Sequence, residues 1–274
     1  MQDDQLITRS LIADQLGSLG VRRGDVLEVH AGLRSVGQVV GGADAVVLAL
    51  LAAVGPDGTI VAVVSVDDDP YHLSDWPAHR QRAYWEEWPP FDPARSSARR
   101  DHGILAERIR TWPEAVRSNH PEMGVAAVGE KASWITEPHP PDFAFGVDTP
   151  YDRIKRAGGK VLMLGAPLST ITMLHHAETI ADIPGKRLVT YEIAVLVDGE
   201  RAWRSFHDIE SGSRGAFPYE NVVPDGADAF EVIARDALAA GVGRRGRAGL
   251  GDAYLFPAQE LVDFAVGWLT ARFA

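Results

Sequence analysis

Two adjacent histidines and a glutamate, within TMLHHAETIADIP (172–184), are the residues best suited to acid–base chemistry. His175 and Glu178 are three positions apart, and residues at this spacing lie on one face of a helix. His176 points roughly 100° away around the same helix, so the two histidines do not act together. Histidine is the side chain whose ordinary pKa lies closest to neutral, which suits a general base. A helix-surface His beside a helix-surface Glu is the plainer interpretation of this pair.

A metal site is the less favoured interpretation of these histidines. The stretch has no His-x₃-His pair. The 274 residues include no cysteine, which excludes thiolate ligands and disulfides. We therefore predict a site without metal.

A second segment, HAGLRSVGQVVGG (30–42), lies between a predicted strand and a predicted helix. Its glycines and small residues would let backbone N–H groups approach a phosphate, and the helix dipole and Arg34 would add positive character. An ordinary strand–helix turn is the alternative. The residues that we consider for this binding role are His30, Ala31, Gly32, Leu33, Arg34, Ser35, Val36 and Gly37.

Acidic residues follow two of the predicted strands. Asp67, Asp68 and Asp69 come directly after an apolar run, and three consecutive carboxylates repel one another unless a cation is near. Asp208 and Glu210 follow a hairpin strand. In both places the alternative is a solvated loop.

The chain alternates predicted strands and helices, which indicates an α/β fold with a mixed central sheet flanked by helices. We expect a single domain over residues 1–274, with an irregular acidic and aromatic insertion around 67–101. Thr149 and Pro150 mark a helix start, and Asp198-Gly199 marks a hairpin turn. The predicted helices are 5–20, 41–55, 102–112, 148–159, 172–182, 227–240 and 257–272, and the predicted strands are 25–33, 58–66, 123–129, 160–166 and the hairpin 188–206.

Composition narrows the classes of partner. The net charge is −11, from 38 acidic and 27 basic residues. Such a surface repels nucleic acid and anionic lipid and attracts cations. The polar start MQDDQLITRS is unlike a signal peptide, and no apolar run is long enough to span a membrane, so we expect a cytoplasmic protein. The motifs GxGxxG, Walker A, HExxH and GxSxG are missing from the sequence.

Several segments together resemble the aminoglycoside 3-N-acetyltransferase family, the antibiotic acetyltransferases outside the GNAT superfamily. The resemblance runs over nearly the whole chain. The segment 137–187 is the most specific, and its Thr-x-x-His-x-x-Glu at 172, 175 and 178 resembles the family signature. The other matching segments are VHAGLRSVG (29–37), VGPDGT (54–59), FDPARSSARRDHGILAE (91–107), RSNHPEMGVAAVG (117–129) and GDAYLFPAQELVDFAVGWL (251–269), the last fitting the family's C-terminal helix.

The resemblance implies an acyltransferase that confers antibiotic resistance by moving acetyl from acetyl-CoA to the 3-amino group of a 2-deoxystreptamine aminoglycoside. His175 would be the base, with Glu178 or Glu210 orienting it, and the amine would attack directly in a ternary complex. The loop 30–37 would hold coenzyme A. The carboxylates that would pair with the polycationic antibiotic are Asp67, Asp68, Asp69, Asp142, Glu178, Asp208 and Glu210.

Three other functions remain open at this point. A related enzyme could acetylate a different amine, although the acidic insertion suits a polycation better than a single amine. A hydrolase of amides or thioesters would need a nucleophile and would consume acetyl-CoA without amine. A non-catalytic protein would bind the drug without acetyl-CoA. The oligomeric state, monomer or homodimer, is not predicted.

Overall fold

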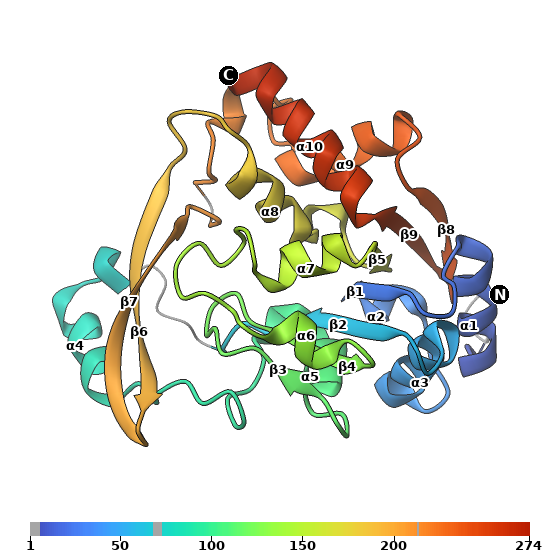
Figure 1. The fold of residues 1–274 in the computed structure, drawn as a ribbon, viewed down its shortest axis with the longest axis horizontal. Coiled ribbons are helices and arrows are strands. Elements are labelled where there is room, and N and C mark those ends of the chain that lie inside the picture. Colours follow the sequence, from blue (N-terminus) through green and yellow to red (C-terminus); the bar gives the residue numbers. More distant parts are fainter. Residues whose placement is uncertain (1–5, 68–72, 213) are drawn as a thin grey trace.

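The structure is a computed structural model that describes residues 6–67, 73–212 and 214–274. Its centre is a seven-stranded mixed sheet in the order β3-β4-β2-β1-β5-β9-β8 (Figure 1). The three central strands β2, β1 and β5 are parallel, and the flanking strands pair antiparallel. The strands of this sheet are β1 Val26–Ala31, β2 Thr59–Val63, β3 Val116–Arg117, β4 Val125–Gly129, β5 Lys160–Leu164, β8 Arg244–Ala248 and β9 Gly251–Pro257.

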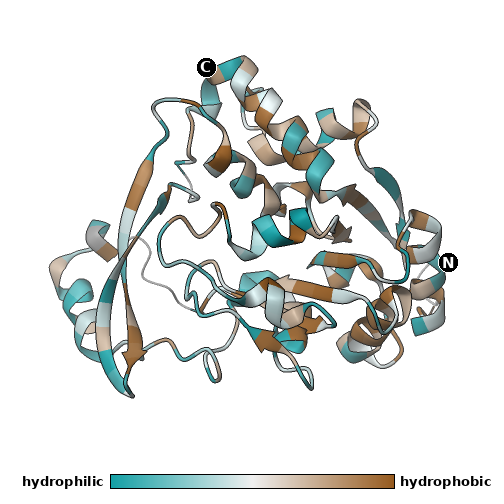
Figure 2. Cartoon of the chain, in the orientation of Figure 1, coloured by the Kyte–Doolittle hydropathy of each residue, from teal (hydrophilic) through white to brown (hydrophobic). Residues whose placement is uncertain are grey.

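Helices cover both faces of this sheet. Helices α1, α3 and α5 contribute to the apolar cluster on one face, and α6 to α10 contribute to the cluster on the other. Figure 2 shows the helices with mixed polar and apolar residues, whereas β1 and β2 are mainly apolar. The helices are α1 Arg9–Leu19, α2 Leu33–Val36, α3 Gly42–Val54, α4 Ala78–Glu87, α5 Gly103–Arg110, α6 Ala132–Thr136, α7 Pro150–Arg156, α8 Met173–Ile180, α9 Ala229–Ala239 and α10 Ala258–Phe273.

The strands supply alternate residues to the two apolar clusters. In β5, Val161 and Met163 belong to one cluster, and Leu162 and Leu164 belong to the other. This is the pleat of a strand that is buried on both faces. A continuous apolar run such as KVLML therefore predicts a central strand, and the sequence-based assignment of this strand is confirmed.

A separate two-stranded hairpin projects at one side of the molecule, formed by β6 (Leu188–Val197) and β7 (Glu200–Ile209) (Figure 1). Its turn is Asp198-Gly199, and both residues have positive φ, as the predicted tight turn requires. Helix α4 lies against it: the rings of Trp85 and Trp203 are 4.1 Å apart. A small apolar cluster thus fixes the insertion against the hairpin.

Three sequence-based assignments need correction. The insertion predicted as irregular contains α4, a polar helix with no buried residue, so it has no apolar stripe to reveal it. Strand β9, Gly251–Pro257, which pairs with β5 and β8, was not predicted, although the predicted helix 257–272 agrees with α10. Strand β8, RRGRA, was not predicted, because it is a largely exposed edge strand rich in arginine.

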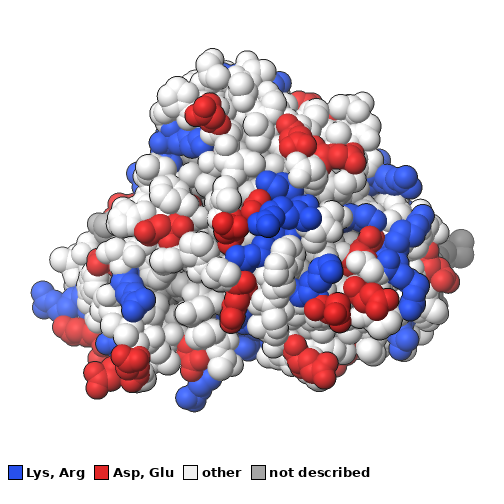
Figure 3. Space-filling view, in the orientation of Figure 1, with Lys and Arg blue, Asp and Glu red and all other residues white. Residues whose placement is uncertain are grey.

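Charge is distributed over the molecule without a single dominant sign on the face drawn in Figure 3, where acidic and basic side chains alternate. Within the ranges that the structure describes, no helix is both long and apolar enough to cross a membrane.

The carboxyl ends of β2, β1 and β5 meet at one edge of the sheet, because these strands are parallel. That edge is where α/β sheets bind ligands.

Candidate active site

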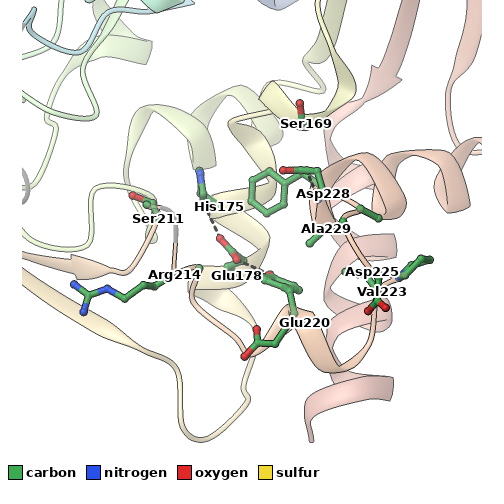
Figure 4. A pocket seen from close by; sticks show the side chains of 17 residues that line it. Ser169, His175, Glu178, Ser211, Arg214, Glu220, Val223, Asp225, Asp228 and Ala229 are labelled. Atoms are coloured by element: carbon green, nitrogen blue, oxygen red, sulfur yellow. Dashed lines mark hydrogen bonds and ion pairs between the residues drawn. The ribbon is translucent and has the colours of Figure 1, made fainter.

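His175 lies on α8, which follows β5 after a short 3-10 turn at Leu168–Thr170. Its Nδ1 is 2.6 Å from Oε2 of Glu178, so the predicted pair does form (Figure 4). A carboxylate can only accept a hydrogen bond, so Nδ1 must be the ring nitrogen that carries the proton. Nε2 of neutral His175 then has a free lone pair, which is the state that a general base requires.

The other oxygen of Glu178 accepts a hydrogen bond from the hydroxyl of Tyr219 at 2.5 Å. Burial and the charge of Glu178 raise the pKa of Tyr219 well above its usual value, so the hydroxyl remains a donor. Glu178 itself is almost completely buried, with 1% of its surface exposed. Two donors therefore hold this carboxylate in one orientation. The sequence analysis did not identify Tyr219. It lies 41 residues after Glu178, and no motif relates its position to that of His175.

Two phenylalanines enclose the imidazole of His175. The ring centroids of Phe145 and Phe230 lie 4.9 and 4.6 Å from it. His176 points the other way, as predicted, and its Nδ1 donates a hydrogen bond to the carbonyl oxygen of Phe145 at 2.6 Å. Lys155 lies 3.0 Å from its Nε2, and burial lowers the pKa of His176 to about 4. Neutral His176 therefore supports the loop that packs on His175.

Three cavities meet at His175, which lines each of them. The first, of about 470 Å³, lies between α8 and α9 and is drawn in Figure 4. The second, of about 390 Å³, is lined by His30, Ala31, Gly32 and Thr172. The third, also about 390 Å³, extends towards Trp76 and Glu122. A base at such a junction can reach two substrates that enter from different sides.

The predicted loop 30–37 reaches this site with its first part only. His30, Ala31 and Gly32 line the second cavity, and Nε2 of His30 is 3.3 Å from Oε1 of buried Glu28. The short helix α2 that follows carries Arg34 and Ser35 with exposed side chains. Leu33, Val36 and Gly37 complete the turn, and Val36 is buried in the core.

The predicted acidic residues lie in different surroundings. Asp208 is buried, its oxygens accept hydrogen bonds from the backbone N–H groups of Ala144 and Ile209, and burial raises its pKa to about 6. Glu210 is buried, and its Oε2 lies 3.5 Å from Nε of Arg214.

Two other acidic residues of the prediction lie further out. Asp142 is half-exposed and accepts a hydrogen bond from the backbone N–H of His207, which lowers its pKa. Asp67 pairs with the exposed Arg100 at 3.3 Å. Asp68 and Asp69 lie outside the described residues.

The model of the aminoglycoside 3-N-acetyltransferase family matches residues 29–270. The chain belongs to this family. Aminoglycoside N(3)-acetyltransferase VII of Streptomyces paromomycinus is 47% identical to it over 272 residues, covering 99% of this chain and 94% of that protein. Aminoglycoside N(3)-acetyltransferase III of Pseudomonas aeruginosa is 41% identical, covering 97% of this chain and 94% of that protein.

Solved structures agree with this assignment. The crystal structure of the aminoglycoside acetyltransferase AAC(3)-Xa superposes with a TM-score of 0.95 at 44% identity, covering 99% of this chain and 95% of that one. AAC-IIIb, solved as a binary complex with CoASH, gives 0.89 at 38% identity and covers 98% of each chain. AAC-VIa bound to sisomicin gives 0.90 at 40% identity, with 98% of this chain and 100% of that one covered. The predicted fold class and enzyme class, an acyltransferase, are confirmed.

Two residues of this acetyltransferase site escaped the sequence analysis. His102 lines the second and third cavities, and burial lowers its pKa to about 4. Glu122 lines the third cavity and is almost fully buried. The segment RSNHPEMGVAAVG gave the only hint of Glu122, through the family resemblance. In the parts of the chain that the structure covers, no cluster of three or more His, Asp or Glu residues is arranged to hold a metal ion.

Proposed function

We propose that this member of the family transfers the acetyl group of acetyl-CoA to the 3-amino group of a 2-deoxystreptamine aminoglycoside, and thereby confers resistance. One observation carries the proposal. His175, with Nδ1 fixed on Glu178, stands where three cavities meet. The complexes of solved relatives with CoASH and with sisomicin agree with both substrates.

The proposed mechanism is direct transfer in a ternary complex. An ammonium group has no lone pair, so the 3-amine must first lose one proton to solvent before it can attack. In the proposal Nε2 of His175 then accepts a second proton, from the neutral amine, as the new N–C bond forms at the thioester carbonyl. The C–S bond then breaks, and the sulfur leaves as CoASH after taking a proton from the imidazolium. Glu178 stabilises that imidazolium while it exists.

No covalent acyl-enzyme is needed for this reaction. The chain has no cysteine, and the described contacts of His175 involve a carboxylate rather than a serine hydroxyl. Of the two carboxylates predicted to orient the base, Glu178 is the one in contact with it. Glu210, held by Arg214 and by the backbone N–H of Gly212, lies behind Ser211 and Gly212 of the cavity wall, and in our proposal it acts on the substrate side.

The two substrates are proposed to occupy different cavities. The segment 30–37 would bind coenzyme A, with Ala31 and Gly32 in the cavity wall and Arg34 outside to meet phosphate. The carboxylates of Asp67, Asp142, Asp208 and Glu210 would provide the negative potential that a polycation requires. The carboxylate of Glu178 would act through His175.

His175→Ala tests the assignment of the base. We expect kcat to fall roughly 10²–10⁴-fold, the usual effect of removing a positioned base. Thiol release from acetyl-CoA is measured with gentamicin, tobramycin, kanamycin, neomycin and apramycin, and without amine. Normal turnover in a folded His175→Ala protein would exclude His175 as the base. Thiol release that needs no amine would favour the hydrolase.

A further inference from the structure

Glu122 is a buried carboxylate that the mechanism above does not use. It lies in the loop before β4, and 4% of its surface is exposed. Its Oε1 is 3.4 Å from Nη2 of Arg99. Its Oε2 is buried, and no hydrogen-bond donor among the described residues contacts it. Leaving a buried charged oxygen without a donor is costly, so the oxygen is expected to meet a ligand.

The position of Glu122 indicates where such a ligand would come from. It lines the third cavity together with Trp76, Thr172 and His175. A molecule that contacts Glu122 within this cavity therefore extends from the catalytic base. The cavity, at about 390 Å³, has room for a single sugar ring together with its substituents.

The chemistry of the cavity favours a cationic ligand with an apolar face. Burial, with smaller contributions from the charges of Asp101 and Asp208 and against the charge of Arg99, raises the pKa of Glu122 to about 7. A ligand cation would offset the cost of burying this carboxylate, whereas a phosphate would add to it. Trp76, whose ring has Arg80 over one face at 4.2 Å, adds an aromatic side chain to the wall of the cavity.

We propose that Glu122 is a specificity-determining residue that binds an ammonium group of the amino sugar attached to carbon 4 of the 2-deoxystreptamine ring. Carbon 4 is adjacent to carbon 3, whose amine must lie at His175. The sugar on carbon 4 is therefore the sugar nearest the base, and in our proposal it enters the third cavity. This inference rests on the proposed function.

Kanamycins A, B and C test the proposal, because they differ only in this sugar. Kanamycin B carries amines at the 2′ and 6′ positions, A has a hydroxyl at 2′, and C has a hydroxyl at 6′. We expect the wild-type protein to have a KM for kanamycin B about tenfold below that for one of the other two, the one that lacks the ammonium group bound by Glu122, as is usual for a charge-assisted hydrogen bond. In Glu122→Gln this difference should disappear, and the KM for acetyl-CoA should not change.

The control is Glu130→Gln, which removes the same charge from an exposed position at the end of β4. It should retain the wild-type preference among the kanamycins. If Glu122→Gln does not fold, Glu122→Asp replaces it, since it keeps the charge and withdraws the carboxylate by one methylene; a reduced preference supports the proposal.

The proposal is overturned if the preference of either folded Glu122 variant equals that of the wild type, or if the wild type shows no preference. In those cases Glu122 serves the fold or binds another group. A wild-type protein that acetylates none of the kanamycins in the presence of acetyl-CoA would instead contradict the proposed function.

Discussion

At the scale of single residues, the feature that matters most is the proton on Nδ1 of His175. Glu178 fixes that proton, and Tyr219 fixes Glu178, so two hydrogen bonds determine which ring nitrogen is basic. The phenyl rings of Phe145 and Phe230 keep the imidazole in place. A carboxylate in contact with histidine thus acts on orientation and on charge at the same time.

We expect Glu178→Gln to lower kcat by roughly 10²–10⁴-fold, because an amide can donate to Nδ1 and so stabilise the wrong tautomer. Tyr219→Phe is the matched control: it removes one hydrogen bond to the carboxylate but keeps its charge. That variant should lose about 1–3 kcal/mol of stability and less than about tenfold in kcat. Steady-state kinetics and denaturant unfolding measure both effects. A wild-type kcat in Glu178→Gln would show that the pair has no catalytic role.

At the scale of elements, the site depends on how closely the ends of two parallel strands approach. Gly32 follows β1 and Gly165 follows β5. A Cβ atom on Gly32 would lie 2.4 Å from the carbonyl oxygen of Gly165, which is backbone and has little freedom to move. The wall of the second cavity therefore requires glycine at this position.

Gly32→Ala should lower the free energy of unfolding by about 1–3 kcal/mol, as overpacking usually does. It should also reduce kcat/KM for acetyl-CoA, because Ala31 and Gly32 line the second cavity. Gly17→Ala, in α1, provides the comparison: a Cβ atom there meets nothing within 4 Å, and alanine favours a helix by up to about 1 kcal/mol. Urea unfolding of both variants measures the difference. Equal effects in the two variants would contradict the close approach of the strands.

At the scale of the whole molecule, buried histidines link stability to pH. The rings of His120, in the loop before β4, and His139, in the loop after α6, lie 4.7 Å apart. Burial lowers the pKa of His120 to about 4 and that of His139 well below its usual value. His120 accepts a hydrogen bond from the backbone N–H of Met123, so the neutral ring is part of the fold.

We expect the thermal unfolding midpoint to fall between pH 7 and pH 5. Histidines of the unfolded chain bind protons near pH 6.5. In the folded chain, His120, His176 and His102 have pKa values of about 4 and bind protons only near that pH. The unfolded state thus gains more protons over this range and is favoured by acid.

Two groups oppose this trend. Glu122 and Asp208 have raised pKa values of about 7 and 6, so acidification favours the folded state through them. Four histidines with lowered pKa values, counting His139, outnumber these two carboxyls. Calorimetry at pH 5, 6 and 7 measures the net effect, and His120→Gln should make the dependence shallower. A higher midpoint at pH 5 would mean that the carboxyls dominate.

The sequence by itself determined the elements that have strong local signals. The apolar run of β5 predicted a central strand, Thr149-Pro150 predicted the start of α7, and Asp198-Gly199 predicted the hairpin turn. The pairing of His175 with Glu178 also followed from local spacing, because one helical turn brings the two side chains together.

Only the tertiary structure decided the rest, because it depends on contacts between distant segments. Tyr219 reaches Glu178 across 41 positions, and Glu122 shares a cavity with His175 although 53 positions separate them. Strand β8 forms because β9 offers it an edge, in spite of its arginine-rich sequence. Spacing along the chain cannot report such neighbours: the order of strands in the sheet sets them, and that order is fixed by the packing of the whole core.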